Sequence, residues 1–163
     1  MPPESRAIAG VADSKQLAPA ERERLEVLIR ARALSVALGA ASVREIAQLN
    51  IHHATVLAMR RAIARLTTVP EALLIDGRRL PTLGLPHQAV IGGDDRCYSI
   101  ACASIVAKVA RDRLMSRLGS RYLPYGWPQN AGYGTPKHCR ALREFGLTPH
   151  HRVRFCETVL GRA

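Results

Sequence analysis

Apolar positions repeat with helical spacing along much of the chain. The repeats predict a helix opened by Pro19, one begun by the capping box Ser42-x-x-Glu45, and helices over about 51–66, 99–118 and 136–145, the last closed by Gly146. The first half of the 99–118 segment is apolar nearly all round, which predicts burial, whereas its second half turns basic. The pattern therefore predicts a protein rich in helices.

Two short apolar runs predict strands instead. They cover about residues 72–76 and 88–91, and a third run, 33–38, is ambiguous between a strand and irregular structure. Residues 1–10 and 121–135 show no regular pattern, and no repeat or linker interrupts the chain. We therefore expect one α/β domain over residues 1–163.

Two aspartates follow the predicted strands. Asp76 closes the run Ala-Leu-Leu-Ile, and Asp94 closes the run Ala-Val-Ile-Gly-Gly. A carboxylate at the point where a sheet meets solvent can ligate a hard cation, and that cation can hold a phosphate. The alternative is an ordinary turn, because Asp and Gly are common turn residues.

The composition narrows the class of partner. The formal net charge is +11, and three of the 24 basic residues are lysines, so that 21 are arginines. The planar fork of arginine pairs with phosphate oxygens in a bidentate way, which favours a polyanionic partner, most simply nucleic acid. A genome-wide preference for arginine codons is the alternative explanation of the charge.

The remaining composition bears on the compartment. The four cysteines show no Cys-x-x-Cys pair and no regular spacing, which predicts reduced thiols in a cytoplasmic protein and fits no known zinc-ligand pattern. No apolar run approaches the ~20 residues of a membrane helix, and no signal peptide is visible. We therefore expect a soluble protein.

Several small polar clusters have both a chemical and a structural interpretation. Ser14 and Lys15 could hold a phosphate or lie in a solvated turn. Lys108 and Asp112 are one helical turn apart, which suits a simple ion pair.

Tyr133 lies between two glycines, where its ring could stack on a sugar or base or merely pack. His138 could act in chemistry or only at the start of a helix, and the same two interpretations apply to His151-Arg152.

Taken together and in order, these segments resemble bacterial ribonuclease HII. The resemblance rests on Asp13-Ser14-Lys15, Glu45-Ile46 with Leu49-Asn50-Ile51, Ala58-Met59, Leu74-Ile75-Asp76-Gly77, Gly93-Asp94, the run from Ala103 to Val109, Arg111-Asp112-Arg113, Tyr125-Gly126, Gly132-Tyr133-Gly134-Thr135, His138 and His151-Arg152. It runs from about residue 8 to the C-terminus and keeps the family's order and spacing.

The resemblance implies an RNase H-like α/β fold, with a mixed sheet flanked by helices and a helical C-terminal part. The family hydrolyses the RNA strand of RNA–DNA hybrids and cuts 5′ of single ribonucleotides in duplex DNA, with four carboxylates and Mn²⁺ or Mg²⁺. Its members are usually monomeric and do not act at a membrane.

Individual roles follow from the same resemblance. Asp76 and Asp94 match the family's third and fourth metal-binding acids, and Tyr133 matches the tyrosine that stacks on the sugar at the RNA–DNA junction. The implied substrate-binding residues are Ser14, Lys15, Lys108, Arg111 and Tyr133.

The sequence departs from the family at one motif. The family's first two acids lie in Asp-Glu-x-Gly-Arg-Gly on the opening strand, and the Gly-Arg-Gly part senses the ribose 2′-hydroxyl. The chain contains neither an Asp-Glu pair nor Gly-Arg-Gly. We therefore expect the chain to begin past the first two strands of the fold and the DNA upstream of the Met1 codon to encode the motif.

Two acids alone hold at most a weakly bound, mostly hydrated Mg²⁺. Asp95 is an extra candidate ligand beside Asp94.

Two functions compete on this basis. One is an enzyme of the ribonuclease HII type, and the other is a truncated, inactive remnant that retains only nucleic-acid binding. A ribosomal or chromatin-like basic protein would explain the charge but not Asp76, Asp94 and Tyr133. We expect the 163-residue chain to make no specific cut in a duplex that carries one ribonucleotide.

Overall fold

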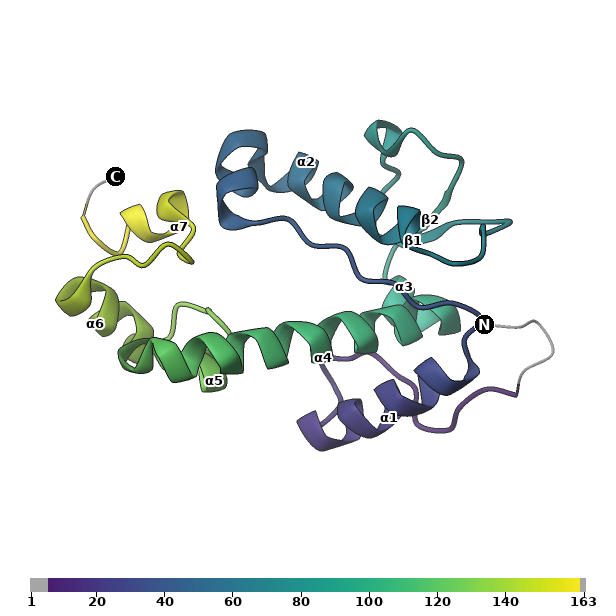
Figure 1. Cartoon of the computed structure of the whole chain (residues 1–163), viewed down its shortest axis with the longest axis horizontal. Coiled ribbons are helices and arrows are strands. Elements are labelled where there is room, and N and C mark those ends of the chain that lie inside the picture. The colour runs from purple at the N-terminus through teal and green to yellow at the C-terminus, as the bar shows by residue number, and fades with distance from the viewer. Residues whose placement is uncertain (1–5, 162–163) are drawn as a thin grey trace. The chain divides into compact units, whose positions relative to one another are not determined.

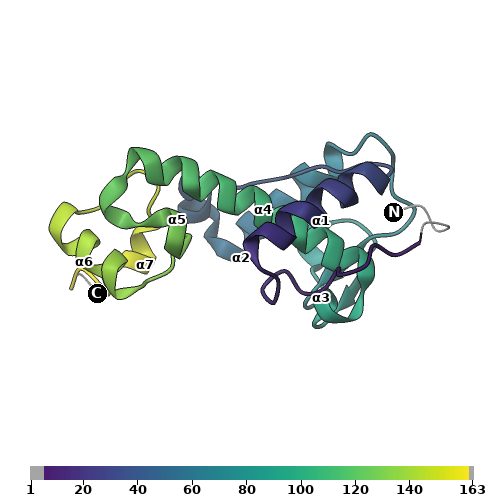
Figure 2. The same cartoon turned by 90° about the horizontal axis from the view of Figure 1, so that it is seen from below.

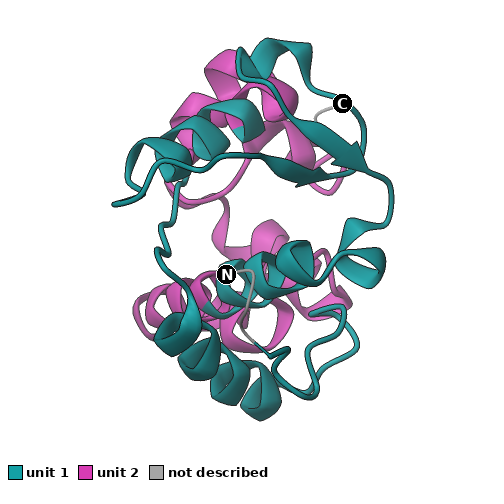
Figure 3. Ribbon diagram, turned by 90° about the vertical axis from the view of Figure 1, so that its right-hand side faces the viewer, with its two compact units in different colours: residues 1–40, 55–109 teal, residues 41–54, 110–163 magenta. Residues whose placement is uncertain are grey.

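A computed structural model describes residues 6–161 of the chain (Figure 1). In chain order the elements are α1 (Pro19–Arg32), α2 (Val43–Ala64), β1 (Leu74–Asp76), the 3₁₀ helix η1 (Pro81–Leu83), β2 (Gln88–Val90), α3 (Gly93–Arg96), α4 (Tyr98–Arg121), the 3₁₀ helix η2 (Leu123–Tyr125), α5 (Trp127–Asn130), α6 (Pro136–Phe145) and α7 (Val153–Glu157). The chain forms two compact units, residues 1–40 with 55–109 and residues 41–54 with 110–163 (Figure 3). The expectation of a single domain stays a prediction.

Local signals explain where the helices begin. Pro19 opens α1, and Thr135 caps α6 by accepting the backbone N–H of His138 at 3.3 Å. The predicted capping box is confirmed, because Ser42 Oγ accepts the Glu45 N–H at 3.2 Å and Glu45 Oε2 accepts the Ser42 N–H at 2.7 Å.

The two helices predicted between residues 42 and 66 form one interrupted helix, α2. Asn50 has φ 66° and ψ 169° inside it, and such a backbone conformation breaks the helical hydrogen-bond ladder. Asn50 Oδ1 accepts the His53 N–H at 3.2 Å, which is the geometry of a new N-cap.

The structure settles one ambiguous segment and corrects one predicted loop. Residues 33–38, for which a strand and irregular structure were both open, are irregular. The predicted loop over 121–135 contains the short helices η2 and α5. The short helix α7 had not been predicted. Of the ten opening residues expected to be irregular, residues 1–5 lie outside the part described.

The sheet consists, within residues 6–161, of the two strands β1 and β2. They are parallel, with Leu74 opposite Gln88 and Asp76 opposite Val90. The pairing extends one bond beyond the strands, since the Gly77 N–H donates to the Val90 carbonyl at 2.9 Å. Both strands were predicted, each slightly longer than observed, and the α/β class is confirmed.

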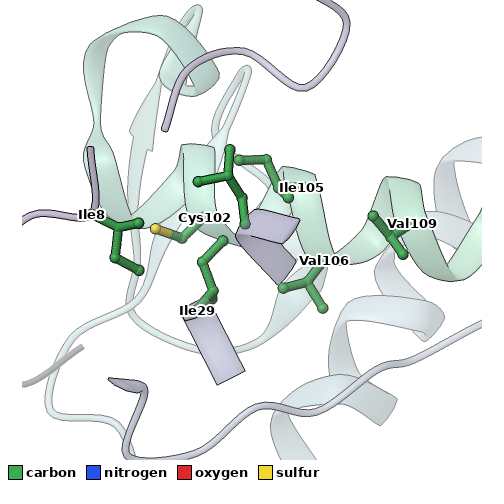
Figure 4. Close-up of a cluster of buried hydrophobic side chains, with 7 residues drawn as sticks. Ile8, Ile29, Cys102, Ile105, Val106 and Val109 are labelled. Atoms are coloured by element: carbon green, nitrogen blue, oxygen red, sulfur yellow. The ribbon is translucent and has the colours of Figure 1, made fainter. Parts of the chain in front are cut away.

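The core of the first unit lies between α1, the first half of α4 and the segment before α1. Figures 1 and 2 show α1 running beside this half of α4. The buried members are Ile8, Leu25, Ile29, Cys102, Ile105, Val106 and Val109, most of which are labelled in Figure 4. Leu25 and Ile105 are fully buried, so hydrophobic burial joins the two helices.

The sequence predicts that the first half of α4 is buried, but the structure leaves part of it exposed. Ala103 and Ala107 are exposed. Small alanine side chains leave little apolar surface in water, so this face tolerates solvent despite its lack of polar groups.

The second unit has its own core around two aromatic residues. Tyr125 and Trp127 stack with ring centroids 5.4 Å apart, and Ala141, Leu142 and Cys156 complete the buried cluster. All four cysteines are free thiols, as their spacing predicts. Among residues 6–161, no helix has both the length and the apolar character needed to cross a membrane.

Arginine side chains bind backbone carbonyls of irregular segments. On α2, Arg60 donates to the Leu83 carbonyl at 2.9 Å, Arg61 to the Ala40 carbonyl at 2.8 Å, and the following Arg65 to the Leu38 carbonyl at 3.0 Å. Arg22, Arg32, Arg96, Arg111 and Arg143 make contacts of the same kind elsewhere. Part of the arginine excess therefore has a structural use, so the net charge overstates what is available to a polyanion.

Candidate metal centre and nucleic-acid contacts

Asp76 ends β1 and reaches toward α3. Its Oδ1 accepts the backbone N–H of Gly93 at 2.8 Å, which fixes the start of α3 against the end of the strand. A Cβ on Gly93 would lie 2.6 Å from Ile100 Cδ1 and 3.3 Å from Asp76 Oδ1. Glycine is therefore required there by the close approach of the two segments.

Asp94 does not close a strand, which corrects the sequence interpretation. β2 ends at Val90, and Gly92 then adopts φ 65° and begins the short helix α3, which carries Asp94 and Asp95 in its first turn. The Asp94 side chain is largely buried, with 12% of its surface exposed.

Three carboxylates of the first unit converge near the end of β1. Asp13, Asp94 and Asp95 each present one oxygen, and these oxygens all lie within 4.8 Å of one another. Asp13 belongs to the segment Asp13-Ser14-Lys15, but no metal-binding role was predicted for it. Its place directly before Ser14-Lys15 was the signal that could have found it.

The ammonium of Lys15 lies against two of these acids, Asp94 and Asp13. Its Nζ donates to Asp94 Oδ2 at 3.0 Å and lies 3.8 Å from Asp13 Oδ2. The hydrogen bond to Asp94, followed by the negative charges of Asp13, Asp94 and Asp76, raises the pKa of Lys15. The same bond lowers the pKa of the Asp94 carboxyl, so both groups are charged at neutral pH.

The turn that carries Lys15 is held from two sides. Asp13 Oδ1 accepts the Lys15 N–H at 3.0 Å, which is an Asx turn. The buried guanidinium of Arg22, on α1, donates to the Ser14 carbonyl at 3.1 Å and also to the Leu17 carbonyl. Ser14 itself is buried, which its expected role as a phosphate ligand did not anticipate.

The donor set fits a hard divalent cation. Carboxylate oxygens are the ligands that Mg²⁺ and Mn²⁺ prefer, and the structure already places a positive charge, that of Lys15, against the Asp94 and Asp13 carboxylates. Gln16 Nε2 donates to Asp95 Oδ1 at 3.3 Å, so Asp95 is tied to the same turn.

The remaining predicted residues lie elsewhere on the chain. Lys108 is on the part of α4 that belongs to the first unit, and Arg111 and Tyr133 belong to the second. Arg111 Nη2 donates to the Ala131 carbonyl at 2.9 Å, so this arginine supports the loop that carries Tyr133.

Tyr133 presents its ring to solvent from an anchored loop. The residue is 70% exposed. The loop before it is fixed by Asn130, whose Oδ1 accepts the Gly132 N–H at 2.8 Å and whose Nδ2 donates to the Tyr125 carbonyl at 2.7 Å. An exposed aromatic ring on an ordered backbone suits contact with a sugar or base.

Comparison with known proteins places this geometry in context. A family model described as Ribonuclease HII matches residues 3–158. The Ribonuclease HII of Granulibacter bethesdensis is 54% identical over 144 residues, which cover 88% of this chain and 66% of that protein. The Ribonuclease HII of Thermosynechococcus vestitus is 51% identical over 151 residues, which cover 92% and 70%. The chain thus spans about two thirds of the length of these curated relatives.

One solved structure shows the same fold. The ribonuclease H2 from Pyrococcus horikoshii OT3 superposes with a TM-score of 0.79 and 23% identity, over 94% of this chain and 81% of that one. At this identity the likeness establishes the fold alone.

Proposed function

Because this chain belongs to the ribonuclease HII family, we propose that it serves the hydrolysis of RNA–DNA hybrids and of duplex DNA that carries single ribonucleotides. Members of this family are metal-dependent hydrolytic endoribonucleases that act on nucleic acid. The observation that carries the proposal for this chain is the convergence of Asp13, Asp94 and Asp95, with the Lys15 ammonium held against Asp94 and Asp13.

Asp76 and Asp94 are the proposed ligands of Mn²⁺ or Mg²⁺. A bound divalent cation would supply an activated water and charge stabilisation at the scissile phosphate. Asp94 would turn its buried carboxylate from Lys15 to the cation, and Asp13 and Asp95 are close enough to add negative charge. The exposed Lys15 ammonium, released from Asp94, would then meet a phosphate oxygen.

Substrate contact is proposed for residues of both units. Tyr133 would stack on a sugar or base through its exposed ring. Lys108 and the guanidinium nitrogens of Arg111 that do not hold Ala131 would meet the phosphate backbone, and Ser14 would support Lys15. We also propose that the protein is a single domain, that it is monomeric, and that it acts in the cytoplasm, where such nucleic acid is found.

The metal site is tested by Mn²⁺ binding, followed by electron paramagnetic resonance of the free ion. We expect Asp94→Asn and Asp76→Asn each to weaken Mn²⁺ binding by about tenfold or more, because each removes an anionic ligand. Glu23→Gln, on the exposed side of α1, is the matched control and should leave binding unchanged. Equal Mn²⁺ affinity in the wild type and Asp94→Asn would refute the site.

The nucleic-acid part is tested with a duplex that carries one ribonucleotide, against an all-DNA duplex of the same sequence. We expect preferential binding of the ribonucleotide-containing duplex, weakened by Tyr133→Ala. The family's Asp-Glu pair is absent from the 163 residues. We therefore expect the duplex to stay uncut when Mn²⁺ is added. Cleavage 5′ of the ribonucleotide, lost in Asp94→Asn, would show instead that these residues suffice.

Binding through arginines alone is the less favoured function. The comparisons match the family over residues 3–158, and many arginines are engaged by backbone carbonyls. Equal binding of both duplexes, unaffected by Tyr133→Ala, would favour it nonetheless.

A further inference from the structure

Two buried histidines of the second unit have no part in the function proposed above. His138 lies in the first turn of α6, and His151 lies just before α7. Their side chains belong to residues that are 3% and 6% exposed, and their Nε2 atoms are 3.1 Å apart. Two buried imidazoles in hydrogen-bond contact need defined protonation states, because two N–H groups or two lone pairs cannot face each other there.

The partners at each end determine these states. His151 Nδ1 lies 2.9 Å from the backbone nitrogen of Thr148, which can only donate, so this ring nitrogen is an acceptor. His138 Nδ1 lies 2.9 Å from the Tyr133 carbonyl oxygen, which can only accept, so this ring nitrogen carries a proton.

The hydrogen bond between the two rings is consistent with the protonation states that the Thr148 and Tyr133 contacts require. A neutral His151 with a bare Nδ1 carries its proton on Nε2 and donates it to His138 Nε2. A neutral His138 with a protonated Nδ1 leaves Nε2 bare to accept it. The indole N–H of Trp127 points to the same His138 Nε2 at 3.4 Å, which again requires an acceptor. The hydrogen bonds therefore run in one direction, from Thr148 through both rings to Tyr133.

The chain of hydrogen bonds ends at the residue with the exposed ring. The Tyr133 backbone is fixed by His138 through its carbonyl and by the Asn130 carbonyl, which accepts its N–H at 2.8 Å. Because the Tyr133 residue is 70% exposed, its backbone sets the direction of the ring. The Tyr133 carbonyl also accepts the Thr135 N–H at 2.8 Å, so loss of the His138 bond would remove one of its two hydrogen bonds and widen the range of its orientations.

We propose that His138, set in its Nδ1–H tautomer by His151, is a positioning residue that aims the Tyr133 ring at nucleic acid. The proposal rests on the substrate-stacking role of Tyr133 in the proposed function. Hydrogen bonds in series polarise one another, so Thr148 and His151 strengthen the bond that His138 makes to the loop.

The tautomers are tested first, on the wild-type protein, by long-range ¹H–¹⁵N correlation of the imidazole rings. His151 should show Nε2–H and His138 the less common Nδ1–H tautomer at pH 7. An Nε2–H tautomer at His138 would overturn the proposal. This measurement needs no variant and does not depend on nucleic acid.

The positioning role is tested by a double-mutant cycle on duplex binding. Tyr133→Ala should weaken binding of the ribonucleotide-containing duplex by about 5- to 150-fold, the range for loss of one aromatic stack. His138→Phe should weaken it by about threefold or more in the wild-type background and leave it unchanged in the Tyr133→Ala background. His138→Asn, whose amide nitrogen can take the place of Nδ1–H, should restore most of the loss.

Controls separate the possible failures. His52→Phe, exposed on α2, is the matched histidine control and should leave binding unchanged. If Tyr133→Ala has no effect on binding, the stacking role of Tyr133 is refuted. The tautomers of His138 and His151 are then still tested separately by the ¹H–¹⁵N measurement. If Tyr133→Ala weakens binding but a folded His138→Phe does not, the positioning role is refuted.

Discussion

Acidification from pH 7 to pH 5 should destabilise the second unit through His151. Burial, and next the charge of neighbouring His138, lower the pKa of His151 to about 4 in the folded protein, whereas an imidazole in the unfolded chain titrates near 6.5. The unfolded chain therefore binds a proton that the folded chain excludes. The stability contributed by neutral His151 is present above about pH 6.5 and is lost as the pH falls toward 4.

The size of the effect follows from the two pKa values. Linkage gives a loss of about 2 kcal/mol in the free energy of unfolding between pH 7 and pH 5, and about 3 kcal/mol by pH 4. The carboxyls with lowered pKa, Asp94 and Glu21, do not contribute much above pH 5, because they are ionised in both states there. The carboxyls with lowered pKa therefore add little to the loss between pH 7 and pH 5.

Trp127 offers a specific assay, because it is the chain's one tryptophan and its ring centroid lies 5.2 Å from that of His151. Urea unfolding followed by its fluorescence at pH 7, 6 and 5 would give the pH dependence. His151→Asn, whose Oδ1 can still accept the Thr148 N–H, is the comparison and should be less stable at pH 7 but nearly independent of pH. Parallel pH dependence in both proteins would refute the reasoning.

Two substitutions test the packing of the first unit by urea unfolding, followed by circular dichroism. A Cβ on Gly39 would lie 1.9 Å from the Ala58 carbonyl oxygen and 2.6 Å from the Ala62 nitrogen. Gly39→Ala should therefore lower the free energy of unfolding by at least about 3 kcal/mol, because backbone atoms cannot move aside as a side chain does. A loss below about 1 kcal/mol would contradict this close approach. Leu25→Ala, at a fully buried position, should cost about 3–5 kcal/mol, whereas Val27→Ala, on the exposed side of the same helix, should cost less than about 1 kcal/mol; similar losses in both would refute the placement of the core.

The parts of the fold that could be predicted are those with local signals. α6 was predicted to the residue, because Pro136 opens it and Gly146 ends it with φ 75°. The strand at Asp76 was found from its apolar run. The helix at Asp94 was missed, because the Gly-Gly before it resembled the end of a strand, whereas Gly92 in fact turns the chain into α3.

The candidate site was predicted in part for the same reason. Asp76 and Asp94 were singled out individually, and the structure links them through the Gly93 N–H. The approach of Asp13 to Asp94 joins residues far apart in the sequence, and no local pattern specifies it. The contact between His138 and His151 likewise depends on how α6 and the segment before α7 pack, which only tertiary structure decides.

The arginines on and after the second half of α2 have a consequence for the order of folding. Three successive carbonyl-binding arginines, Arg60, Arg61 and Arg65, hold the segments around residues 38–40 and 82–83, which have little regular structure of their own. Neither segment can acquire these bonds before the helical turns around Arg60 and Arg61 exist. The amides of both segments should therefore be protected from hydrogen exchange no more strongly than the amides of these helical turns. The turns and the two segments should open together as one cooperative unit.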